Sequence, residues 1–182
     1  MFGGHGYIEE WGMSQFVRDA CIAMIYEGAN GVQAMDLVGR KLAKDGGRAV
    51  MSFFDEVSRY CRAQGEHEAM QPYTAPVAES LGHLQQATMW FMNNAMARPD
   101  NAGAGATDYM HLFGLVAMGY MWAQMAEAAL RRREDPQARA QMEARLVTGR
   151  HFMQRILPET ALRLKRIETG ADTTMALAAD QF

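Results

Sequence analysis

The sequence has little of several features that mark special classes of protein. Its 182 residues include only two cysteines, Cys21 and Cys61, which lie on apolar faces without Cys-x-x-Cys spacing. We therefore expect two reduced core thiols, with a disulfide or a metal role as the alternative. No apolar run reaches the roughly 18 residues of a membrane span, and the N-terminus lacks the basic and apolar regions of a signal peptide. These absences favour a cytoplasmic protein that does not cross a membrane.

Positive charge is not in excess either. The chain has 18 Lys and Arg against 21 Asp and Glu, a formal net charge of −3, which speaks against nucleic-acid binding. The basic run Arg131–Arg133 precedes Glu134-Asp135-Pro136, and cations in that place suit the C-terminal end of a helix. A nucleic-acid site is the weaker interpretation, because no aromatic residues interleave with these arginines. The five histidines form no Glu-x-x-His pairs, so we expect no metal site.

Long alternations of apolar and polar residues, the pattern of half-buried strands, are also missing. Apolar residues instead recur at helical spacing in a chain that is 49% hydrophobic and long enough to bury a core. The sequence therefore predicts an all-α fold, an up-and-down helical bundle. The expected helices cover residues 14–25, 30–42, 48–63, 76–96, 107–133 and 137–170, with a start or a kink at Pro76, a loop over 98–105 and a break near Leu157-Pro158.

Glycine and methionine add two expectations to this bundle. The helix from Thr107 or Asp108 to Arg133 is apolar almost all round, which predicts a central position. Gly114 and Gly119 inside it predict close approach of neighbouring helices. The chain also holds 16 methionines, which ordinary core filling explains. The alternative is a methionine-lined groove for an acyl chain or a partner helix.

The chemistry of the N-terminal segment centres on Glu27. Gly28 and Gly31 interrupt the helical pattern, so this carboxylate lies at a junction between two helices. Against a pocket wall it would be desolvated and suited to take a proton from carbon. The alternative is a solvated side chain that a helix dipole stabilises. Ser14 is the expected N-cap of the first helix, whose apolar stripe we expect to be buried: Phe16, Val17, Ala20, Cys21, Met24 and Ile25.

Three short motifs follow one another over residues 3–30. They are the loop Gly3-Gly4-His5-Gly6-Tyr7, the pair Arg18-Asp19, and the segment Ile25-Tyr26-Glu27-Gly28-Ala29-Asn30. In this order and at this spacing they resemble the C-terminal helical domain of the acyl-CoA dehydrogenases, flavoenzymes that desaturate acyl-CoA thioesters. The runs Val32–Leu42 and His151–Glu159 resemble a bacterial branch of that family with an extra C-terminal helical extension.

The resemblance implies a role for the segment around Glu27. Glu27 is then the catalytic base, which removes a proton from the carbon next to the thioester carbonyl, while the neighbouring carbon gives a hydride to FAD. Tyr26 and Gly28 are the implied substrate-binding residues. No metal is needed for this reaction.

The resemblance also implies two places of contact with FAD. Gly3 and Gly4 resemble a loop that approaches the FAD of a neighbouring subunit, because absent side chains let backbone come close. Ala29 and Gly31 resemble a second contact at a helix start. Ala29 departs from the threonine that the family usually has, which removes a hydroxyl and leaves backbone N–H contacts.

The resemblance divides the chain in two and implies its partners. Residues 1–45 resemble the end of the C-terminal helical domain, and residues 46–182 resemble the extension, packed as one unit with it. The implied partners are acyl-CoA, the family's other domains or a sister subunit, electron-transfer flavoprotein or another acceptor, and further copies in a homo-oligomer. The alternative function is a non-catalytic helical module for interaction or oligomerisation through an exposed apolar face.

Overall fold

The computed structural model describes residues 3–26, 28–95 and 97–181, and these residues contain helices and no strand. The predicted all-α bundle is confirmed. The helices are η1 (Gly3–Tyr7), η2 (Glu9–Trp11), α1 (Met13–Ile22), α2 (Asn30–Asp36), η3 (Leu37–Lys41), η4 (Lys44–Gly47), α3 (Arg48–Gly65), η5 (Glu68–Met70), α4 (Gln71–Asn94), α5 (Pro99–Arg131), α6 (Arg139–His151), η6 (Phe152–Ile156), α7 (Glu159–Glu168) and η7 (Ala179–Gln181).

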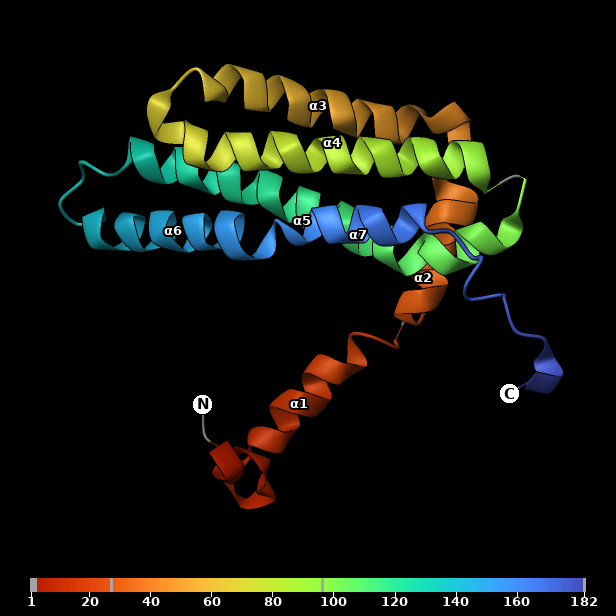
Figure 1. Ribbon diagram of the computed structural model, residues 1–182. Helices are drawn as coiled ribbons and strands as arrows, with labels where there is room; N and C mark the ends of the chain where they lie inside the picture. Colours follow the sequence, from red (N-terminus) through yellow and green to blue (C-terminus); the bar gives the residue numbers. More distant parts are fainter. Residues whose placement is uncertain (1–2, 27, 96, 182) are drawn as a thin grey trace.

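The bundle consists of α3, α4, α5 and the rod formed by α6, η6 and α7, which lie side by side (Figure 1). Helix α5 contacts α2, α4, α6 and α7, which confirms its predicted central position. No helix of the described ranges is long and apolar enough to cross a membrane. The core holds large side chains with almost no exposure: Val57, Tyr73, Val77, Leu84, Tyr109, Leu112, Val116, Met142, Met153, Leu157 and Ile167.

Two predicted helix starts are wrong: the start at Pro76, which was one of two alternatives there, and the start after the expected loop of small residues over 98–105. Helix α4 begins at Gln71 and continues through Pro76, so the start does not lie at Pro76. Helix α5 begins at Pro99, not at Thr107 or Asp108, and residues 99–105 are helical instead of forming a loop. Pro99 opens the helix because its fixed φ suits the first turn, where a missing N–H removes no helical bond. The break near Pro158 is confirmed between η6 and α7.

The two glycines within α5 behave differently. A Cβ added to Gly119 would lie 3.2 Å from Val77 Cγ2 and 3.3 Å from the methyl carbons of Leu157, so helices α4 and η6–α7 come close there, as predicted. A Cβ added to Gly114 would meet no atom within 4 Å, because this glycine lies on the exposed face of the helix. The predicted close approach at Gly114 is therefore wrong within this chain.

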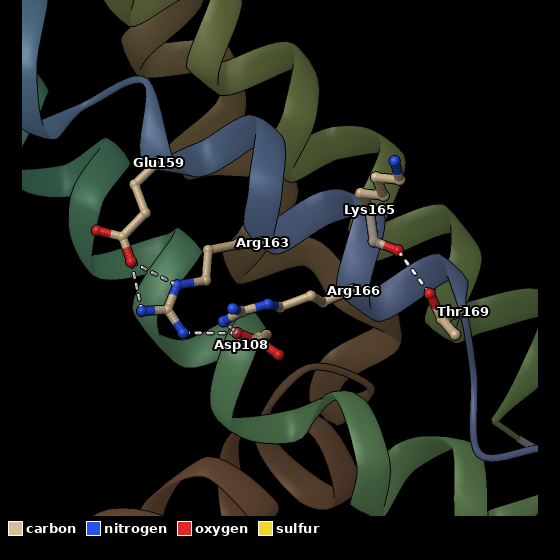
Figure 2. Close-up of polar contacts among 6 residues, drawn as sticks. All are labelled: Asp108, Glu159, Arg163, Lys165, Arg166 and Thr169. Atoms are coloured by element: carbon tan, nitrogen blue, oxygen red, sulfur yellow. Dashed lines mark hydrogen bonds and ion pairs between the residues drawn. The ribbon is translucent and has the colours of Figure 1, made fainter. Parts of the chain in front are cut away.

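Charged side chains join α5 to α7 at the edge of the bundle. Figure 2 shows Arg163 of α7 between Asp108 of α5 and Glu159, one turn earlier in α7. Arg163 donates from Nη1 to Asp108 at 2.6 Å and from Nε to Glu159 at 2.9 Å, and both Arg163 and Asp108 are largely covered. These contacts fix the rotation of α7 about its own axis relative to α5, because the planar guanidinium group of an arginine can bind carboxylates in only a few orientations.

A buried hydrogen-bonded pair makes the bundle sensitive to high pH. The Tyr109 hydroxyl lies 2.8 Å from Thr88 Oγ1, and Thr88 donates to the Leu84 carbonyl at 2.8 Å. Burial raises the pKa of Tyr109 from 10.0 to about 12 and that of Cys61 from 9.0 to about 11. A group whose folded pKa is raised gives stability that is complete below its unfolded pKa and is lost as pH rises through the folded value.

We expect the free energy of unfolding to fall between about pH 10 and 12 because of Tyr109. Tyr109→Phe should flatten that fall, while costing about 0.5–1.5 kcal/mol at neutral pH through the lost hydrogen bond. Denaturant unfolding of both proteins across this pH range measures the difference. An unchanged slope in the variant would contradict the assignment to Tyr109.

Candidate active site

The N-terminal arm, residues 3–26, extends away from the bundle (Figure 1). It contains η1, η2 and α1, and none of these helices has a buried residue. The predicted buried stripe of the first helix is therefore wrong: Phe16 is 68% exposed and Ile25 63%. Cys21, predicted as a core thiol, is exposed, whereas Cys61 is buried as expected. The stripe has the right spacing, but nothing in the described part of this chain covers it.

Contacts within the arm set the start of α1. Gly12, with φ of 70°, occupies the N-cap position that we expected for Ser14. Ser14 instead donates its hydroxyl to Glu9 at 2.5 Å, and Arg18 lies 3.6 Å from the same carboxylate oxygen. The Ser14 hydrogen bond and then the charge of Arg18 lower the pKa of Glu9. Arg18, part of the recognised Arg-Asp pair, therefore ties the loop before α1 to the helix.

The junction between α1 and α2 is built on one glycine. Helix α1 ends at Ile22, a turn over residues 23–26 follows, and Asn30 begins α2 with its N–H donating to the Met24 carbonyl at 3.0 Å. Gly28 has φ of 110°, and a Cβ there would lie 2.5 Å from Gln33 Nε2. Other residues rarely adopt this φ, so the sharp turn depends on glycine at position 28.

Glu27, the predicted base, lies outside the described residues, and its burial stays a prediction. Its neighbour Tyr26 is 55% exposed, and Met24 and Ile25 are also exposed. The turn over residues 23–26 therefore presents an apolar surface. Such a surface can supply one wall of a water-excluding pocket once a second surface covers it.

The predicted cofactor residues form two separate groups. Gly3 and Gly4 lie in η1, beyond the start of α1, whereas Ala29 and Gly31 lie at the start of α2. Helix α1 is 10 residues long, so about 15 Å of helix separates the two groups. A Cβ added to Gly3, Gly4 or Gly31 would meet no atom within 4 Å. Each group leaves backbone open to a ligand, and the fold does not bring the two groups together.

An apolar cavity lies where the α2–η3 segment meets the bundle, and no single motif of the sequence marks its position. It has a volume of about 410 Å³ and lies between the α2–η3 segment, the end of α4 and the start of α5. Apolar spacing places Met35, Val38 and Leu42 on one face of a helix, but it cannot show that the opposite wall leaves a gap. The main lining residues are Met35, Val38, Leu42, Phe91, Met92 and Ala95.

Comparisons with known proteins cover nearly all of the chain. Residues 53–178 match the family described as "Acetyl-CoA dehydrogenase C-terminal like", and residues 1–42 match "Acyl-CoA dehydrogenase, C-terminal domain". The chain is 32% identical over 180 residues to 3-methylmercaptopropionyl-CoA dehydrogenase of Ruegeria pomeroyi, covering 95% of this chain and 30% of that protein. It is 24% identical over 189 residues to the broad-specificity linear acyl-CoA dehydrogenase FadE5 of Mycobacterium tuberculosis, covering 99% and 31%.

A further relative is butyryl-CoA dehydrogenase of Syntrophomonas wolfei, at 22% identity over 189 residues, or 99% of this chain and 30% of that protein. The chain thus spans about 30% of the length of these relatives. The matched regions include the arm, the junction and the bundle. Together they show that this chain belongs to the acyl-CoA dehydrogenase family and corresponds to its C-terminal helical region.

Proposed function

We propose that this chain is the C-terminal part of an FAD-dependent acyl-CoA dehydrogenase, with Glu27 as the general base. The observation that carries the proposal is the family match over residues 1–42, which includes the arm and the complete junction. The relatives are named for their action on acyl-CoA thioesters. The substrate class that follows is an acyl-CoA, whose α,β bond is desaturated.

The junction geometry suits a base that works beside another surface. Gly28 holds the turn in a conformation that other residues rarely adopt. Exposed Tyr26 and Ile25 supply apolar walls, and the remaining domains of the enzyme would cover them. Covering removes water, raises the proton affinity of a carboxylate, and prepares it to take the α proton. Tyr26 and Gly28 would line the substrate pocket.

The residues present fit an FAD held through backbone contacts. Gly3 and Gly4 would meet it at the far end of the arm, and Ala29 and Gly31 at the junction, with about 15 Å of helix between the groups. Because Ala29 has no hydroxyl, its contact would use the backbone N–H. When bound, FAD accepts the hydride from the β carbon. The separation of the two groups is consistent with contacts to two different FAD molecules in a homo-oligomer.

The same proposal assigns partners and a boundary. The exposed arm would pack on the family's other domains or on a sister subunit, and electron-transfer flavoprotein or another acceptor would reoxidise the flavin.

We place the boundary between the catalytic segment (residues 1–45) and the extension (46–182) at the turn before α3. Asp45, Gly46 and Gly47 all have positive φ there, which supports a sharp change of chain direction.

The FAD content of two purified proteins tests the proposal. A longer polypeptide that carries this chain behind the family's other domains should be yellow, and acyl-CoA should bleach it under anaerobic conditions. The 182-residue chain alone should retain no flavin, because the FAD contacts that we propose for it are two short backbone patches, at Gly3-Gly4 and at Ala29–Gly31. A colourless longer polypeptide would instead favour the second candidate, a non-catalytic interaction module, which the exposed apolar arm also supports.

A further inference from the structure

One face of α5 is exposed and uncharged although the helix is central to the bundle. Its residues recur every three or four positions from one end of the helix to the other. Three of them are large: Met118, Met121 and Met125 are 53%, 47% and 42% exposed. We call this face the α5 stripe: Ala104, Thr107, His111, Gly114, Met118, Met121, Met125 and Ala128.

The α5 stripe has an uneven distribution of side-chain size. Its first half carries small or medium side chains and ends at Gly114, where a Cβ would meet no atom within 4 Å. Its second half carries the methionines. A surface with hollows at one end and projections at the other is complementary to itself when turned end over end. A parallel copy would instead set methionine against methionine.

Opposite charges mark the two ends of the stripe. Asp100 is exposed in the first turn of α5, and Arg132 directly follows the last turn; its side chain is 63% exposed and lies 3.9 Å from Asp135 of the same chain, a loose ion pair that leaves it open to a second acid. Both lie on the line of the stripe at helical spacing. In an antiparallel pair of copies, each acid would meet the partner's base. In a parallel pair, like charges would meet at both ends.

We propose that a second copy of this chain binds the α5 stripe, with the two α5 helices antiparallel about a twofold axis near residue 116. One alignment of the two helices places large side chains against small ones and acids against bases. Each Met118 then lies over Gly114 of the other copy, and the remaining opposed positions are His111 and Met121, Thr107 and Met125, Ala104 and Ala128, and Asp100 and Arg132.

The size of the stripe sets the strength of this association. From Ala104 to Ala128 the helix rises about 36 Å, and with a helix diameter of about 10 Å the footprint is roughly 400 Å² per copy. The total of about 800 Å² is typical of weak and transient complexes, so we expect a dimer with micromolar affinity. The uncharged, exposed face and its division into a small-residue half and a methionine half are independent of the proposed catalytic role of Glu27.

Sedimentation equilibrium of the 182-residue chain tests the proposal over about 5 to 500 µM, a range that brackets the affinity expected for such an interface. Asp100→Arg and Arg132→Asp should each weaken dimerisation about tenfold, because each places like charges at both ends. The two reversals together should restore it. Asp180→Arg makes the same change in charge away from the stripe and should leave the dimer unchanged.

A second variant separates association from folding. Gly114→Leu fills open space in the single chain, so far-ultraviolet circular dichroism should stay the same, while the hollow for the partner's Met118 is lost and dimerisation with it. A chain that stays monomeric to the highest concentration overturns the proposal. So does a dimer indifferent to the charge reversals, which would point to association through the exposed arm.

Discussion

Glu27→Gln should lower acyl-CoA desaturation by about a hundredfold to ten-thousandfold in the longer polypeptide that carries this chain, the range over which a positioned general base contributes. Glutamine keeps the size and a hydrogen-bonding group but cannot accept the α proton. Substrate binding should change far less, because the substituted amide has nearly the shape of the carboxyl group it replaces. Steady-state kcat and KM, measured with a dye acceptor, separate the two effects.

Two controls make the Glu27 result specific. Glu66→Gln removes an exposed carboxylate from the turn after α3 and should leave kcat unchanged. The visible spectrum of the Glu27→Gln protein should keep its flavin bands, since the predicted FAD contacts are at other residues. Full turnover in this variant would show that another group takes the proton, even where the protein still binds FAD.

Leu84→Ala should lower the free energy of unfolding by about 2–5 kcal/mol, the range for leucines truncated in a packed core. Leu84 has 0% exposure in the middle of α4, and α4 contacts α3, α5 and α7. The substitution leaves a hole that these helices can only partly close. Since a domain of this size is stable by about 5–15 kcal/mol, the loss is a large share of the total.

A matched leucine controls for the change in composition. Leu162 of α7 is 47% exposed, so Leu162→Ala should cost below about 1 kcal/mol. Urea unfolding followed by circular dichroism gives both values. Similar losses at the two positions would show that α4 is not at the centre of the cooperative unit.

The spacing of apolar residues predicted the positions of the helices better than it predicted which residues pack against them. Helix α3 and the break before α7 were expected from apolar spacing and from Pro158, because each depends on local sequence. The predicted start of α5 was wrong, because the Ala and Gly residues after Pro99 are typical of a loop. In the structure this segment packs closely: a Cβ added to Gly105 would lie 2.8 Å from Phe91 and 3.6 Å from Ile167. Local propensity was overridden there by tertiary packing.

Burial was the property that sequence could not give. Phe16 and Val17 are spaced like core residues, and Gly114 like Gly119, yet only Gly119 faces a neighbouring helix. Many methionines predicted as core filling are exposed, Met118 among them. A periodic pattern predicts that one face of a helix will be buried. It does not show whether the surface that buries it belongs to the same chain. The site motifs were found through family resemblance, and the roles of their residues stay predictions.

The chain reaches the bundle through α2 and leaves it after α7 at one and the same end (Figure 1). The connections from α3 to α4 and from α5 to α6 lie together at the opposite end, and the second of them is exposed over residues 131–137. That far end is a natural attachment point for a fluorophore or an epitope tag, because exposed loop tips tolerate insertions. A probe after Glu134 would report on the movement of the whole bundle without disturbing the junction at Gly28.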